Sequence, residues 1–282
     1  FHALVALSRK YVGARKVLQG LDTRYRTETS LGEALIRIRS LLTLALLFPL
    51  YAFAQKKFAP IRARTGGALR AAVSGGGALP PYVDQFFAAV GITLLEGYGL
   101  TETSPVLASR TFERQVLGTV GLPVPDTEIK VVDEKGEILP PGEMGVIKCR
   151  GPQVMEGYYK KPEETAGAID EEGWFDTGDL GRFTVRGELS LTGRAKETIV
   201  LLGGENVEPT PIEDAITESP FSSQVMIVGQ DRKTLGAIVV PECQALQERG
   251  GLEGRTPEEL CTHEAVIALI RDEVRQLTSE DR

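Results

Sequence analysis

The chain has 282 residues, of which 42% are hydrophobic and 25% are charged. This composition excludes a disordered or fibrous protein, and the length is sufficient for two domains with buried cores. A net charge of −7 does not favour nucleic acid as a partner, and two histidines with three scattered cysteines argue against a His-rich metal site or a disulfide framework.

Basic residues are concentrated at the start of the chain. Residues 1–70 contain 13 lysines and arginines and 3 acidic residues, whereas the remainder contains 19 and 36. Such a segment would complement anionic lipid, the phosphates of coenzyme A or an acidic carrier protein, and a solvated positive face is equally open. The chain begins at Phe1 and ends within a helical pattern without a secretory signal, so we expect an internal piece of a longer cytoplasmic or organelle-stroma protein.

The first predicted elements are helices. Residues 1–39 have helical composition and spacing, and residues 40–54 are almost wholly apolar. The apolar run is shorter than the roughly 20 residues of a membrane span. We predict a buried helix kinked at Pro49, with peripheral docking on a bilayer as the alternative.

The next elements predict a parallel sheet. Leu69–Val73 is a short strand, Pro80 and Pro81 open a helix around residues 80–90, and Ile92–Leu95 is a second strand. The order strand, helix, strand is typical of a βαβ unit with parallel strands.

From residue 116 the sequence pattern changes to short β-rich segments separated by turns that contain proline and glycine. Ile129–Val132, Gly145–Cys149 and Glu188–Thr192 predict a small, mostly antiparallel subdomain. Helices near 211–218 and 264–278 and strands Val225–Val228 and Leu235–Val240 follow it. The predicted fold class is α/β: a parallel βαβ subdomain in residues 1–115, a β-rich subdomain in 116–194 and an α+β domain in 195–282.

Two glycine-containing turns follow the predicted parallel strands. Gly75, Gly76 and Gly77 lie before a helix, where a ligand can approach the backbone, although alone this pattern is more typical of a structural turn. The segment from Gly97 to Pro105 is more informative: Tyr98 can stack on a base, Thr101 can bond a phosphate oxygen and Glu102 can hold Mg²⁺. Ligands usually bind at the ends of strands in open α/β sheets.

Three later patches carry polar side chains. Gly173–Leu180 is a predicted loop in which Asp179 is the candidate to accept hydrogen bonds from ribose hydroxyls. Arg194 offers a planar donor fork and Lys196 a mobile charge, close to the predicted domain boundary. Gly203–Pro209 is a turn that leads into a helix.

In this order, the phrases VSGGGALP, GYGLTETSP, GWFDTGDLG and GRAKETIVLLGGENVEP resemble the adenylate-forming (ANL) superfamily of acyl-CoA synthetases, luciferases and peptide-synthetase adenylation domains. The chain is most similar in appearance to long-chain fatty acyl-CoA synthetases and acyl-acyl-carrier-protein synthetases. The resemblance covers residues 60–240 most clearly. It implies the ANL fold, truncated at both ends, with residues 1–115 as the second half of a large N-terminal domain.

The resemblance also implies the reaction and the role of each residue. The implied enzyme is an acid-thiol ligase that uses ATP and Mg²⁺ to convert a fatty acid to acyl-AMP and passes the acyl group to coenzyme A or acyl carrier protein. The nucleotide would contact Gly75, Gly76, Gly77, Glu96, Gly97, Tyr98, Gly99, Thr101, Asp179 and Arg194. Thr101, Glu102 and Lys196 would be catalytic, with Glu102 on Mg²⁺ and Lys196 at the hinge of a swinging domain. Gly203 and Gly204 would line the approach of the thiol.

The chain departs from the superfamily pattern at three points. The Ser/Thr/Gly-rich phosphate loop ending in Pro-Lys and the distal lysine that drives adenylation are not found in it, and Val200 stands where many relatives have a second lysine. We therefore expect these 282 residues alone to form no acyl-AMP. The alternatives are a ligase for an aryl or amino acid, a nucleotide-binding fragment without turnover, and a peripheral membrane module built around residues 40–54.

Overall fold

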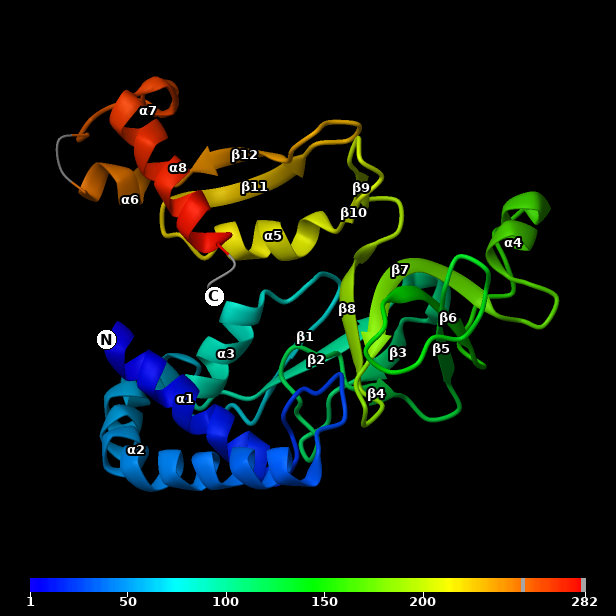
Figure 1. The fold of residues 1–282 in the computed structure, drawn as a ribbon, viewed down its shortest axis with the longest axis horizontal. Coiled ribbons are helices and arrows are strands. Elements are labelled where there is room, and N and C mark those ends of the chain that lie inside the picture. The colour runs from blue at the N-terminus through cyan, green and yellow to red at the C-terminus, as the bar shows by residue number, and fades with distance from the viewer. Residues whose placement is uncertain (250–251, 280–282) are drawn as a thin grey trace. The chain divides into compact units, whose positions relative to one another are not determined.

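The computed structural model describes residues 1–249 and 252–279. The chain divides into two compact units, Phe1–Leu191 and Thr192–Arg282. Figure 1 shows the element labels used below.

The first unit begins with two helices rather than one continuous helical segment. Helix α1 (His2–Gln19) ends at Gly20, whose left-handed conformation has a φ of 72°. Helix α2 (Ser30–Arg64) begins after Thr29, whose side chain accepts a hydrogen bond from the Gly32 amide. The prediction that residues 1–39 are helical is therefore wrong for the loop between the two helices.

The prediction that the apolar run 40–54 is a buried helix is correct for its conformation and wrong for its burial. The run lies in the middle of α2, which continues through Pro49 and Pro60. Ser40, Ala54 and Phe58 are the buried residues of this helix, while most of its leucines are exposed. Composition predicted an apolar helix but does not say which of its faces another element covers.

The predicted βαβ unit is confirmed. Strand β1 (Ala72–Ser74), helix α3 (Pro81–Val90) and strand β2 (Leu94–Gly99) follow in order, and the two strands pair in parallel with Ser74 opposite Glu96. The 3₁₀ turn η1 (Thr101–Thr103), strand β3 (Val106–Ser109) and strand β4 (Leu122–Pro123) come next. The sheet has the order β1-β2-β3-β4, and its last two pairings are antiparallel.

The β-rich segment forms a second four-stranded sheet in the order β5-β6-β7-β8. Its elements are β5 (Glu128–Val132), β6 (Gly145–Arg150), helix α4 (Pro162–Ala168), β7 (Phe175–Phe183) and β8 (Leu189–Arg194). The pairings of β5 with β6 and of β6 with β7 are antiparallel, as predicted. The prediction that Gly173–Leu180 is a loop is wrong from Phe175 onward, because those residues belong to β7.

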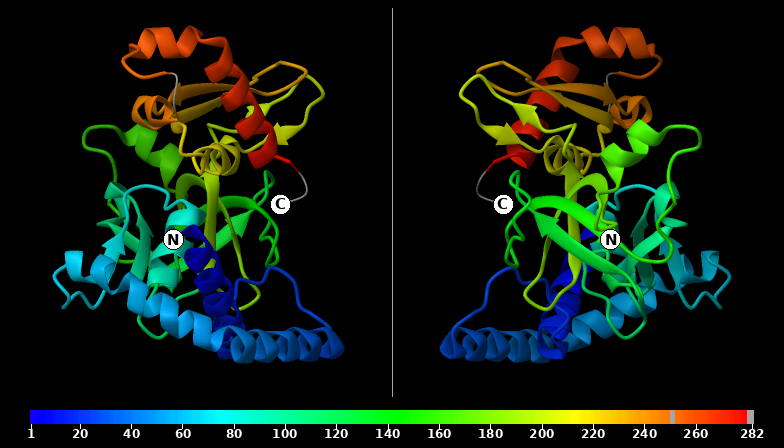
Figure 2. Two further views of the ribbon diagram at one scale, coloured as in Figure 1. Left: turned by 90° about the vertical axis from the view of Figure 1, so that its left-hand side faces the viewer. Right: turned by 90° about the vertical axis from the view of Figure 1, so that its right-hand side faces the viewer.

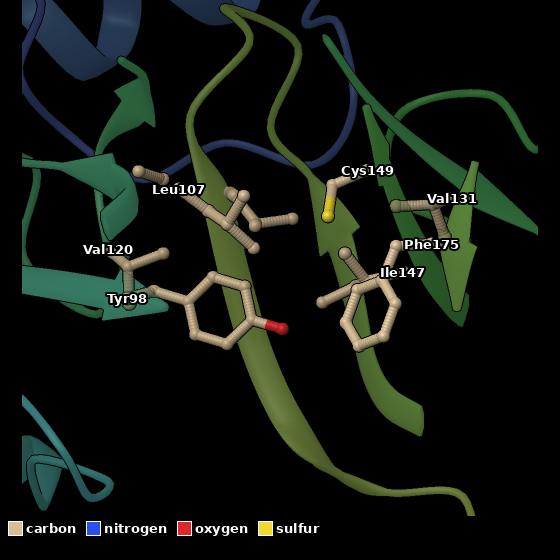
Figure 3. Close-up of a cluster of buried hydrophobic side chains, with 9 residues drawn as sticks. Tyr98, Leu107, Val120, Val131, Ile147, Cys149 and Phe175 are labelled. Atoms are coloured by element: carbon tan, nitrogen blue, oxygen red, sulfur yellow. The ribbon is translucent and has the colours of Figure 1, made fainter. Parts of the chain in front are cut away.

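One hydrophobic core joins the two sheets of the first unit. Figure 3 shows Leu107 and Val120 on one side of it and Ile147, Cys149 and Phe175 on the other. Burial raises the pKa of the Cys149 thiol to about 12, so this cysteine stays protonated and acts as an apolar core residue.

The second unit is a small α+β structure. It contains β9 (Ile199–Val200), β10 (Asn206–Val207), α5 (Pro209–Ile216), β11 (Ser222–Val228), β12 (Gly236–Pro241), α6 (Cys243–Glu248), α7 (Pro257–Thr262) and α8 (Glu264–Leu277). The predicted helices and strands of this segment are confirmed to within a few residues. Strands β9 and β10 form one antiparallel pair, and β11 and β12 form another.

Candidate nucleotide site

The end of strand β2 and the turn after it are fixed by close backbone packing. A Cβ atom at Gly99 would lie 1.5 Å from the carbonyl oxygen of Pro105, so only glycine fits there. The Thr103 hydroxyl accepts a hydrogen bond from the Leu100 amide at 2.9 Å and lies 2.8 Å from the Pro105 carbonyl oxygen, to which it can donate. The candidate segment therefore has one defined path between β2 and β3.

The glycine turn after β1 lies beside this segment. The parallel register places Ser74 opposite Glu96, so the turn leaves the sheet next to the end of β2. A Cβ atom at Gly75 would lie 3.2 Å from the Gly97 carbonyl oxygen, and Gly76 has a φ of +81° that side chains disfavour. The structure thus brings together two of the patches that the sequence analysis singled out.

Glu96 is held by a buried ionic network that the sequence analysis missed. The guanidinium of Arg110, fully buried after β3, contacts Glu96 Oε2 at 2.7 Å and both carboxylate oxygens of Asp84 at 2.9 Å. The Arg110 amide also donates to the Glu96 carbonyl at 2.9 Å. Asp84 belongs to α3 and accepts a further hydrogen bond from the Gly118 amide. An aspartate within a mostly apolar helix was the one signal in the sequence.

Burial changes the ionisation of two groups in this network. Desolvation raises the pKa of Glu96 to about 7, while the charge of Arg110 opposes the increase. Lys16 of α1 lies close by and donates to the Gln115 carbonyl. Burial, followed by the charge of Arg110, lowers the pKa of Lys16 to about 8.

Asp179 reaches the candidate segment from strand β7. The Tyr98 hydroxyl donates a 2.7 Å hydrogen bond to Asp179 Oδ2, and both residues are buried, at 7% exposure each. Figure 3 shows the tyrosine ring within the core, with its oxygen directed away from Leu107 and Val120. Burial and the charge of Asp179 raise the pKa of Tyr98, so its hydroxyl stays protonated and can donate. Stacking of a base on Tyr98 remains a prediction. Only 7% of this residue is exposed, so a base could contact no more than a small part of the ring.

Thr101 and Glu102 lie at the surface of the same segment. The Glu102 side chain accepts a 3.0 Å hydrogen bond from the hydroxyl of Tyr158, and its backbone carbonyl accepts from the Met155 amide at 2.8 Å. Thr101 is exposed and begins η1. Both side chains are more exposed than those of Glu96 and Asp179, which expose 8% and 7% of their surface.

The other candidate residues belong to the second unit. Arg194 ends β8, and its carbonyl accepts from the Glu197 amide in a turn that contains Lys196. Lys196 lines a groove of about 1000 Å³ within this unit. Gly203 and Gly204 form the turn between β9 and β10, and Gly204 has a φ of +82°. Val200 pairs with Asn206 in that hairpin.

Two family models match most of the chain. The model described as AMP-binding enzyme matches residues 33–159, and the model described as AMP-binding enzyme C-terminal domain matches residues 196–272. This chain belongs to the AMP-binding family of adenylate-forming enzymes. The first match contains the glycine turn and the segment from Glu96 to Glu102, and the second contains Lys196, Gly203 and Gly204. The fold class predicted from the sequence is confirmed.

Curated relatives of this AMP-binding chain include fatty acid ligases. It is 45% identical over 84% of its length to a chloroplastic long-chain-fatty-acid–[acyl-carrier-protein] ligase of Arabidopsis thaliana, of which it covers 33%. It is 38% identical over 77% of its length to a long-chain-fatty-acid–CoA ligase, FadD15, of Mycobacterium tuberculosis, of which it covers 35%. The chain therefore spans about a third of the length of these relatives.

A solved structure shares the fold. ATP-bound MatB from Rhodopseudomonas palustris superposes with a TM-score of 0.60 at 30% identity, over 79% of this chain and 42% of that one. The match supports the α/β fold class of this chain.

The residues present fit a magnesium ion held jointly with a nucleotide. Within residues 1–249 and 252–279, no group of three or more histidine, cysteine, aspartate or glutamate side chains is placed to hold a metal. Mg²⁺ at nucleotide sites typically takes one or two carboxylates and completes its shell with phosphate oxygens and water. The accessible carboxylate of Glu102 suits that arrangement, whereas a site made only of protein ligands does not.

Proposed function

We propose that this chain carries part of the active site of an ATP-dependent acid-thiol ligase that activates a long-chain fatty acid. The observation that carries the proposal is the convergence of Asp179 from β7 on Tyr98 in the AMP-binding segment of β2. Two residues from separate sheets meet there, next to the glycine turn. The names of the fatty acid ligases to which the chain is similar support the substrate class.

Asp179 and Tyr98 are proposed to grip the nucleoside. The carboxylate of Asp179 accepts hydrogen bonds from the ribose hydroxyls, and the Tyr98 hydroxyl holds one of its oxygens in place. Gly75, Gly76 and Gly77 have no side chains, so the backbone can approach the adenine and the acyl carboxylate closely. Arg194 assists at the ribose.

Thr101 and Glu102 are proposed to act on the phosphates. The Thr101 hydroxyl donates to an oxygen of the α-phosphate, and Glu102 is a ligand for Mg²⁺, which neutralises the charge on the phosphate oxygens. Both side chains belong to a turn whose backbone is fixed, so they present their polar atoms without a large ordering cost on binding.

The proposed reaction has two steps. An oxygen of the fatty acid carboxylate attacks the α-phosphorus of ATP, the bond to the bridging oxygen breaks and pyrophosphate leaves with its electron pair. A thiol of coenzyme A or acyl carrier protein then attacks the acyl carbon, loses its proton and releases AMP. Lys196 is the proposed hinge between the two steps, and Gly203 and Gly204 line the approach of the thiol.

Charge and the names of the relatives support the proposed acceptor and location. The basic segment 1–70 complements both coenzyme A and an acidic carrier protein, and the two named relatives use one of each. A cytoplasmic or stromal location is proposed, because the Arabidopsis relative is named as chloroplastic. Peripheral attachment to a membrane is the remaining part of the proposal, and α2 is the element that supports it.

The proposal is tested by fatty-acid-dependent exchange of labelled pyrophosphate into ATP, measured on the natural full-length protein. Exchange with palmitate is expected, with loss in both Glu102→Ala and Asp179→Ala. Glu128→Ala is the matched control, because this carboxylate on β5 is exposed and pairs with Arg150. Exchange with aryl or amino acids instead would identify another ligase, and the absence of exchange with every carboxylate would leave only nucleotide binding.

A further inference from the structure

Helix α2 exposes a continuous apolar face. Leu31, Leu35, Ile38, Leu42, Leu46 and Phe53 recur at three- and four-residue spacing or its multiple, which places them on one side of a helix with 3.6 residues per turn. Each exposes at least half of its surface, and Leu46 exposes 75%. Leu41, Phe48 and Leu50 widen the same face. An uncovered row of this length on a soluble protein indicates an interaction site.

The opposite face of α2 is attached to the first unit. Ala54 and Phe58 pack in a core cluster with Val90 and Ile92. Tyr51 stacks on Tyr11 of α1 at 4.0 Å, and Gln55 donates to the Ala89 carbonyl at 2.8 Å. Figures 1 and 2 show α2 on the outside of this unit, with α1 along one side.

The packing of α2 against the first unit indicates whether this helix crosses a membrane or lies on its surface. Among the described residues, α2 is the one helix long and apolar enough to cross a membrane on length and composition alone. A crossing would place α1 and the polar contacts of Gln55 and Arg62 in hydrocarbon, at a high desolvation cost. A helix with one packed face and one exposed apolar face instead fits the plane of the membrane interface.

Charge identifies the kind of bilayer. Helix α2 contains six basic residues and one acidic residue, Glu33. Arg37, Arg39, Lys56 and Lys57 are all exposed, and the helical period places them along both edges of the apolar face and at its end. Basic side chains around an apolar stripe are attracted to anionic head groups while the stripe enters the acyl boundary. An apolar protein partner would not account for this frame of positive charge.

We propose that the exposed face of α2 docks on an anionic lipid bilayer, with the helix lying in the interface plane. The proposal rests on the proposed function for its purpose, because a long-chain fatty acid partitions into bilayers and a docked enzyme meets its substrate there. Leu31 to Phe53 enter the acyl boundary, and the four exposed basic residues contact lipid phosphates. Binding therefore weakens as salt concentration rises.

Vesicle flotation tests the docking directly. The natural full-length protein is expected to float with phosphatidylcholine vesicles that contain phosphatidylserine, and much less with phosphatidylcholine alone. Leu42→Glu with Leu46→Glu, and separately Lys56→Gln with Lys57→Gln, are each expected to lower the partition coefficient by about tenfold or more. Leu202→Glu is the matched control, because Leu202 is an exposed leucine of the second unit, at 63% exposure, and should leave flotation unchanged.

Fluorescence separates lipid from a protein cover. Leu46→Trp is introduced, and its emission is taken as the difference between the spectra of this variant and of the wild type. Emission that shifts to the blue only when anionic vesicles are added supports the proposal. Emission that is already blue-shifted without vesicles, or a dimer that Leu46→Glu dissociates, would overturn it in favour of a protein cover. Pyrophosphate exchange with soluble fatty acid should survive Leu46→Glu, so loss of docking and failure of the proposed activity are separate results.

Discussion

Helix α2 and the neighbourhood of strand β2 lie in the same compact unit, and they depart from the usual placement of side chains in opposite directions. In α2, most leucines and the side chains of Phe48 and Phe53 are exposed, and the one acidic residue of the helix, Glu33, lies in its first turn, far along the helix from Lys56 and Lys57. Around β2, Asp84, Glu96 and Arg110 are buried together. Apolar side chains outside and charged ones inside both cost free energy relative to the opposite arrangement.

The two departures are compensated differently. The charges around β2 are satisfied within the unit, because Arg110 bonds both carboxylates, so the network is a completed structure that fixes the candidate nucleotide segment. The apolar face of α2 is not satisfied within the described residues of the unit, so its compensation must come from outside it. The buried network therefore indicates that its residues position the β2 segment, whereas the uncovered apolar face of α2 indicates a binding partner.

The largest effect is expected from Arg110→Met. This variant leaves Asp84 and Glu96 buried without their cation, so the free energy of unfolding should fall by about 3–5 kcal/mol in urea denaturation. Arg150→Met is the matched control. Arg150 makes a comparable contact to Glu128, but the two side chains are 41% and 61% exposed, and a change of about 1 kcal/mol or less is expected. Equal losses in the two variants would mean that burial of the network does not matter.

Glu96→Gln sharpens the same point through pH. Because the pKa of Glu96 is raised from 4.5 to about 7 in the folded chain, the protonated form is favoured by folding. The contribution of protonated Glu96 to the free energy of unfolding is fully present below pH 4.5 and is lost as pH rises through about 7. The shift in pKa corresponds to about 3 kcal/mol of stability. Thermal unfolding of the wild type across this range should show the decline, and Glu96→Gln should remove it. A decline that persists in the variant would assign it to another group.

Tyr98→Phe should have an intermediate effect. Loss of the hydroxyl removes one hydrogen bond from the buried Asp179, which should lower the free energy of unfolding by about 1–2 kcal/mol. Binding of AMP should weaken as well, because Asp179 is then held less firmly for the ribose. Calorimetric titration with AMP checks this, and unchanged affinity would mean that Tyr98 does not position Asp179.

The smallest effect is expected from Tyr158→Phe. The Tyr158 hydroxyl also donates to a carboxylate, Glu102, but this pair lies at the surface and competes with water. A change of less than about 1 kcal/mol in the free energy of unfolding is expected. A loss as large as that of Tyr98→Phe would remove the distinction between buried and exposed tyrosine–carboxylate pairs.

Local patterns allowed the βαβ unit and the β-rich sheet to be predicted. The signals are local: a proline at the start of α3, a glycine after β1 and short β-branched runs. Each affects the conformation of residues next to it, so it can be recognised in the sequence itself. Strand β7 was mistaken for a loop because Gly178 and Gly181 interrupt its β-rich pattern. A Cβ atom at Gly181 would lie 2.5 Å from the Ser190 carbonyl oxygen, so the glycine is needed inside the sheet.

Long-range pairings could not be predicted in the same way. Asp84 and Arg110 are 26 residues apart, and Tyr98 and Asp179 are 81 residues apart. Their contacts depend on how two sheets pack, which no local pattern encodes. The prediction that residues 40–54 are buried was wrong for a related reason. Apolar composition indicates that burial of the helix is favourable, but it does not show which surface the helix packs against.

The most direct test of the central claim is calorimetric titration of the natural full-length protein with a non-hydrolysable acyl-adenylate, palmitoyl sulfamoyl adenosine. Tight binding to the wild type is predicted, with much weaker binding of the benzoyl analogue and a loss of at least about tenfold for palmitoyl sulfamoyl adenosine in Asp179→Asn. Equal affinity for the two analogues would contradict the fatty acid assignment. Equal affinity of the wild type and Asp179→Asn would contradict the site itself.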